Sequence, residues 1–257
     1  MGVNMLIQME IRKVIKNKGI IILSVGIPIL IFLLYLNYTM NKNSVIFEPA
    51  LLSVTNTISF FIALYCILLV NIWAAIVGSY VGNNDNINQT IYNYIGLRGR
   101  CIPYCAKLAA LLFLNVVYTL ILTCLPYMIA VVKLKEIKFD FVLIVTQAMF
   151  ISVIGFSVSI IAYVISVIIK SETISNVIVI ITFYIPMMLG GELFVKLKYF
   201  NPLYYFEGKL EVIFGNLEEL EHFRINAGEF QQWHFIIGYL LIYIVLLFLV
   251  IKRRNYK

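Results

Sequence analysis

Charge is scarce in this sequence. Of its 257 residues only 13% are charged, 62% are hydrophobic, and the mean hydropathy is +0.94. A soluble domain carries roughly a quarter of charged residues. Here too few charges remain to cover a surface facing water, so lipid must surround most of the chain. Backbone polar groups in lipid need internal partners, and the apolar stretches are continuous rather than alternating. The sequence therefore predicts an all-α integral membrane protein.

A phosphate-binding loop of the form Gly-x-x-x-x-Gly-Lys-Ser/Thr is also missing. Gly208 and Lys209 form the one Gly-Lys pair, and Leu203 stands where the first glycine of such a loop would be. Without the glycine-rich cradle the chain has no recognisable means of holding ATP. Any work driven by ATP would have to come from another chain.

Residues suited to catalysis, metal binding or ion relay are equally few. The two histidines, His222 and His234, fall in a predicted outer segment, and the apolar stretches hold essentially no acids or bases. A proton or sodium relay would need such groups within the membrane. Cys101 and Cys105 have no histidine nearby to complete a metal site. We therefore expect no catalytic, metal or cofactor-binding residue on this chain.

What the sequence does contain is a series of long apolar segments within one domain, residues 1–257. A helix needs roughly 20 residues to cross the bilayer. Each segment reaches this length or comes close to it. Hydropathy predicts six transmembrane helices: Ile20–Met40, Leu51–Tyr80, Leu108–Val132, Phe141–Ile169, Ile174–Phe194 and Phe235–Ile251. The second and fourth exceed the required length, so they tilt or continue beyond the membrane as helices.

Residues 1–18 form a different kind of segment. Apolar residues recur at helical spacing from Val3 to Ile15, and Gln8, Arg12 and Lys16 lie largely opposite. This pattern predicts a basic amphipathic helix lying in the headgroup layer. A cleaved signal peptide is the alternative, but no small-residue cleavage site follows the first apolar run.

The distribution of basic residues predicts that both termini are cytoplasmic. With that orientation, twelve of the 20 Lys and Arg residues lie on the inner side. The positive-inside rule favours this arrangement, although Lys133, Lys135 and Lys138 run against it. It places residues 82–107 in the cytoplasm and residues 195–234 outside.

The cytoplasmic stretch 82–107 reads GNNDNINQTIYNYIGLRGRCIPYCAK. Ile91, Tyr94 and Ile95 form an apolar ridge at i, i+3, i+4, and Thr90 is placed to cap a short helix. An ordinary basic loop lying on anionic lipid is the alternative interpretation.

This stretch resembles the loop after the second span of ABC-2-type exporter permeases, in which an acid, a threonine, an arginine and a lysine follow in that order. Asp85 stands where the family has glutamate, and the family's proline before the arginine is missing, with Gly96 nearby. A second resemblance lies outside, where Asn201, Pro202, Tyr204 and Tyr205 resemble the family's stretch of short re-entrant helices before the last span. The segments follow the family's order across nearly the whole chain.

The resemblance implies the permease subunit of an ABC exporter. Two such chains, identical or different, would pair in the bacterial plasma membrane with separate ATPase subunits that carry ATP and Mg²⁺. The segment that couples to the ATPase would comprise Asp85, Thr90, Ile91, Tyr94, Ile95, Arg98, Arg100 and Lys107. The translocation path would be lined by Asn56, Asn71, Asn176 and Thr182, whose other role is hydrogen bonding between helices. Sparse charge favours an amphipathic or hydrophobic cargo, a peptide, toxin or antibiotic, exported or expelled for immunity. The alternative is an ATP-independent scaffold, sensor subunit or passive carrier.

Overall fold

A computed structural model describes residues 3–40, 67–88, 101–134 and 141–184, together with positions 241, 242, 244, 245 and 249. Within these ranges the chain is helical apart from short turns, so the prediction of an all-α fold is confirmed. The helices are α1 (Val3–Lys16), α2 (Lys18–Met40), α4 (Ile67–Asn88), α6 (Cys101–Leu134), α7 (Phe141–Ile169) and α8 (Glu172–Val179), which continues as the π-helical turn η2 (Ile180–Tyr184).

Two stretches of the described residues are long and apolar enough to cross a membrane. They are Ile102–Leu125 of α6 and Ile151–Ile169 of α7, and the bent pair formed by α1 and α2 raises the number to three if it counts as one span. The protein is thus compatible with a membrane location. The predicted segments Leu51–Tyr80 and Ile174–Phe194 are only partly within the described residues, and Phe235–Ile251 falls almost wholly outside them.

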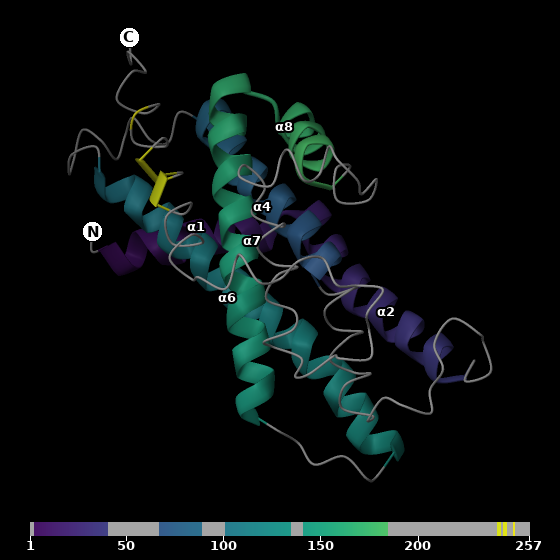
Figure 1. Ribbon diagram of the computed structural model, residues 1–257. Coiled ribbons are helices and arrows are strands. Elements are labelled where there is room, and N and C mark those ends of the chain that lie inside the picture. The colour runs from purple at the N-terminus through teal and green to yellow at the C-terminus, as the bar shows by residue number, and fades with distance from the viewer. Residues whose placement is uncertain are drawn as a thin grey trace.

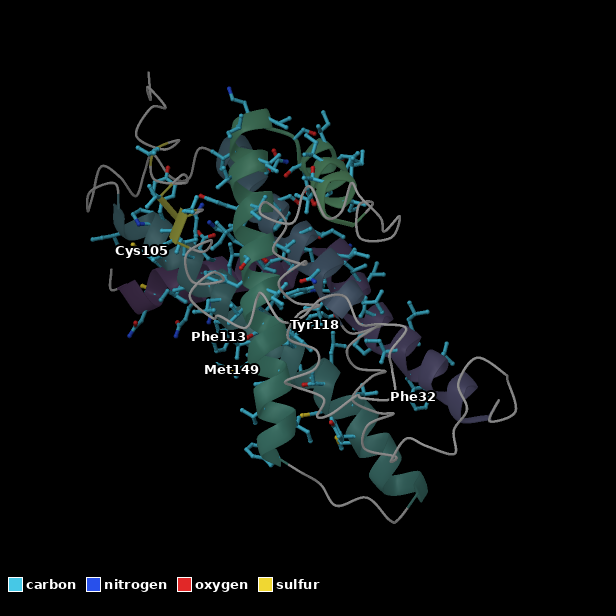
Figure 2. All side chains as sticks on the ribbon, viewed as in Figure 1. Phe32, Cys105, Phe113, Tyr118 and Met149 are labelled. Atoms are coloured by element: carbon cyan, nitrogen blue, oxygen red, sulfur yellow. The ribbon has the colours of Figure 1, made fainter. Side chains whose placement is uncertain are left out.

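Helix α7 is the centre of the bundle. It crosses the middle of Figure 1 in green, with α4, α6 and α8 against it. Of its apolar stretch 78% is buried, against 39% of the corresponding stretch of α6. Helix α6 therefore presents a side to the surroundings, and that side is apolar: Leu112, Phe113, Val117 and Ile121 are all exposed. Figure 2 labels Phe113, together with the exposed Met149 and Phe32. The exposed apolar side of α6 is suited to contact with lipid or with a second membrane helix.

Helices α4 and α7 run in the same direction. Ala74 contacts Ser159, and further along both helices in the same direction Ser79 contacts Ser166. The end of α4 and the end of α7 consequently lie at the same end of the bundle. Helix α4 ends at Asn88, beyond the Tyr80 expected from hydropathy, so Gly82 and Asp85 stand on a helix that continues past the apolar run.

Two sharp turns lie within the described ranges. Between α1 and α2 the axis bends by 74°, and the side chain of Asn17 accepts hydrogen bonds from the backbone nitrogens of Gly19 and Ile20 at the start of α2. Between α7 and α8, Lys170 takes a left-handed conformation with φ 61°. Ser171 then caps α8 by accepting a hydrogen bond from the Ile174 amide at 3.4 Å. Side-chain caps at both turns satisfy amides that the helices leave free.

Candidate functional site

Helices α4 and α7 approach each other closely at two glycines of α4. A β-carbon at Gly78 would overlap the backbone of Ser159, and one at Gly82 would stand 2.7 Å from the carbonyl oxygen of Tyr163. The Gly78-x-x-x-Gly82 spacing predicts such an approach, and the structure confirms it. Small residues allow backbones to meet at van der Waals distance, which is the main source of helix association in lipid.

Serine side chains of α7 cross this contact and bond to the backbone of α4. The Ser159 hydroxyl donates to the carbonyl of Ala74 at 2.9 Å, and the Ser166 hydroxyl donates to the carbonyl of Ser79 at 2.7 Å. Asn115 of α6 joins them through Nδ2, which donates to Ser159 Oγ at 3.0 Å. Three helices are thereby held by polar bonds in a region that is otherwise apolar.

Helix α8 is joined to the same group. The Ser79 hydroxyl donates to Asn176 Oδ1 at 2.6 Å, and the Ser175 hydroxyl donates to the carbonyl of Ala162 at 2.8 Å. These bonds form two groups along the α4–α7 contact, Asn115 with Ser159, and Ser166 with Ser79 and Asn176. We call these five residues together the polar seam. All of them except the partly buried Asn176 are buried. The seam thus links α4, α6, α7 and α8 through hydrogen bonds.

A second polar contact ties α2 to the bundle. Trp73 of α4 and Tyr118 of α6 stack with ring centroids 4.1 Å apart. The Trp73 indole Nε1 donates to Ser24 Oγ at 2.8 Å. Figure 2 labels Tyr118, which lies inside the helix bundle. Ser24 thus connects α2 to both α4 and α6.

The residues predicted to line a translocation path differ in their surroundings. Asn71 is fully buried, and neither atom of its amide has a hydrogen-bond partner among the residues that the structure describes. Asn176 belongs to the polar seam, whereas Thr182 is exposed on η2. Asn56 lies outside the described residues. The three described side chains thus lie in different surroundings, and the role of all four residues in a path stays a prediction.

Of the residues predicted to couple to an ATPase, Lys107 has a described side chain. It is 3% exposed and lies beneath α1, where Glu10 and Lys13 act on its charge. Lys13 Nζ forms an ion pair with Glu10 at 2.7 Å. Asp85 stands on the last turns of α4, without a described side chain. Thr90, Ile91, Tyr94, Ile95, Arg98 and Arg100 lie outside the described residues, as do Asn201, Pro202, Tyr204 and Tyr205 of the outer segment.

Several of these contacts are not evident from the sequence, although two of them have a recognisable signal. The serines of α7 resemble many others in apolar helices, yet Gly155 and Ser159 stand four residues apart, the small-xxx-small spacing typical of close helix contacts. The burial of Glu10 also has a signal, because it shares the spacing of Leu6 and Val14 on the buried side of α1.

Within the ranges that the structure describes, no three His, Cys, Asp or Glu side chains gather to hold a metal ion. A scan against protein-family models finds no match for this sequence, and neither does a search of curated proteins.

Proposed function

We propose that this chain is the membrane-spanning permease subunit of an ATP-driven ABC exporter. It would span the membrane six times with both termini in the cytoplasm and pair with a second permease chain. Hydrolysis would take place on a separate ATPase subunit, because the sequence lacks a phosphate-binding loop of its own.

The observation that carries the proposal is the place of residues 89–100 between α4 and α6. Helix α4 ends at Asn88, immediately before this stretch, and α6 begins at Cys101, immediately after it. The predicted ridge of Ile91, Tyr94 and Ile95, preceded by Thr90, would thus be attached directly to two helices of the bundle. A partner subunit that binds the ridge would therefore apply force to both helices.

The polar seam supports this interpretation. Its hydrogen bonds connect α4 to α7 and α8, and α6 to α7, and the close contact at Gly78 leaves little room for sliding. A displacement applied at the end of α4 would therefore move these helices together rather than deform α4 alone. Conversion of ATP-driven closure into movement of a transport path needs such stiffness.

A preference for an amphipathic or hydrophobic cargo, such as a peptide, toxin or antibiotic, follows from the same surfaces. The buried polar groups of the described helices are mostly hydroxyls and amides, which bond either to another helix or to the backbone of their own helix, and Lys107 and Glu10 are the buried charged residues. A charged solute would find few partners in such an interior.

The test begins with purification of the tagged full-length chain from its own organism and identification of a copurifying subunit with a phosphate-binding loop. The pair is then reconstituted in vesicles, and ATP-dependent cargo movement is measured for the parent and for Ile91→Ala/Tyr94→Ala. We expect this double variant to lose ATP-driven transport, while Phe113→Leu on the exposed side of α6 keeps it. Transport by vesicles without an ATPase, or full transport by the double variant, would contradict the proposal and favour an ATP-independent carrier.

A further inference from the structure

Helix α1 separates its charges by sign. Its one acidic residue, Glu10, is only 7% exposed and faces the bundle, paired with Lys13 and next to the buried Lys107. Three cations remain on the outside: Arg12, Lys16 and Lys18 are exposed at the end of α1 and the start of α2. The outward surface of residues 3–18 therefore carries positive charge alone.

The same surface carries apolar side chains. Met5 is 54% exposed and Ile15 is 56% exposed. At 100° per residue, Met5, Arg12, Ile15 and Lys16 fall within about a third of the helix circumference. Cationic and apolar groups on one helix face match the boundary between phosphates and acyl chains.

The bend between α1 and α2 orients the outer face of α1 toward the boundary between lipid phosphates and acyl chains. Helix α2 exposes a stripe of apolar side chains, Ile22, Val25, Ile29 and Leu33, which suits lipid on that side. Helix α1 leaves α2 at 74°. If α2 stands close to the membrane normal, α1 lies almost in the membrane plane at the end where α2 begins.

We propose that the outer face of α1 and the adjoining start of α2, through Arg12, Lys16 and Lys18, bind anionic phospholipid selectively over zwitterionic phospholipid. The occupant is the anionic leaflet itself, because positive charge without a neighbouring acid complements a phosphate surface that carries net charge. The burial of Glu10 is what makes the face selective, since an exposed carboxylate there would repel the same headgroups. This inference goes beyond the transport function and holds with or without an ATPase.

The experiment uses the full-length protein carrying Ile15→Trp, reconstituted without any partner into vesicles of phosphatidylglycerol and phosphatidylcholine. In one set the phosphatidylglycerol carries brominated acyl chains, and in the other the phosphatidylcholine carries the same chains. Quenching of the added tryptophan, corrected for the parent protein, reports which lipid surrounds α1. Phe113→Trp on the exposed side of α6 is the matched control.

A basic residue near an anionic surface favours anionic lipid by about fivefold. We expect phosphatidylglycerol to be enriched around Ile15→Trp at least about fivefold over phosphatidylcholine, and not around Phe113→Trp. High salt should remove the enrichment. Arg12→Gln/Lys16→Gln/Lys18→Gln should also remove it, and Arg12→Lys/Lys16→Arg/Lys18→Arg should keep it. Equal quenching by both lipids at Ile15→Trp, or an enrichment insensitive to salt, would overturn the proposal even if the triple glutamine variant fails to fold.

Discussion

The backbone carbonyl of Ser159 occupies the space where a β-carbon on Gly78 would stand. This contact fixes the separation of α4 and α7, and it brings the serine hydroxyls of α7 within bonding distance of the α4 carbonyls. The seam and the close approach therefore depend on each other.

Gly78→Ala should consequently force α4 and α7 apart. We expect a loss of about 1–3 kcal/mol in the free energy of unfolding, the usual penalty for overpacking, measured by SDS titration of the purified protein. Gly26→Ala is the control, because a β-carbon there meets no atom within 4 Å. It should be neutral or slightly stabilising, since alanine has the higher helix propensity. Equal stability of the two variants would show that the α4–α7 contact is looser than described.

The bond from Trp73 to Ser24 is the second testable joint. Trp73→Phe keeps an aromatic ring against Tyr118 but removes the indole donor. We expect this variant and Ser24→Ala each to lose about 1 kcal/mol of unfolding free energy. The double variant should lose less than the sum of the two, because the shared bond can be lost only once. Strict additivity in the same titration would mean that the bond contributes nothing to stability.

Glu172 gives the fold a pH dependence. Partial burial at the start of α8 raises the pKa of its carboxyl above the ordinary value of 4.5. The folded state therefore binds a proton more tightly than the unfolded state. This group favours folding most below pH 4.5, and its contribution falls as the pH rises from 4.5 through the folded pKa.

Glu172→Gln should flatten that part of the stability profile. Thermal unfolding of the purified protein between pH 4 and pH 8 measures it, and we expect the variant to gain on the parent as the pH rises. A parallel shift of the two curves, with no change in slope, would show that Glu172 titrates normally.

The helices were largely predictable from sequence, but their contacts were not. Helix α7 has the predicted bounds, Phe141–Ile169, because a continuous apolar run in lipid permits only one backbone conformation. The close approach at Gly78 also followed from its spacing. Lys107 shows the limit: its place beside an apolar run gives no sign that its side chain is buried next to Glu10 of α1. The amphipathic pattern of α1 predicts a buried side without indicating which helix that side contacts.

Substitution of the buried Asn71 tests stability and transport in the same variant. The Asn71 amide is fully buried, with no hydrogen-bond partner in the described part of the chain, and an unsatisfied buried amide costs about 1–3 kcal/mol. Asn71→Leu, of similar volume, should therefore stabilise the protein by about that amount in SDS titration. Asn115→Leu is the matched control, because Asn115 bonds to the carbonyl of Leu111 and to Ser159; it should be destabilising. If Asn71 lines the path of an exporter, the stabilised variant should also lose transport in vesicles with its ATPase. A variant that is more stable and transports normally would remove Asn71 from the path, and one that is less stable would show that its amide is satisfied.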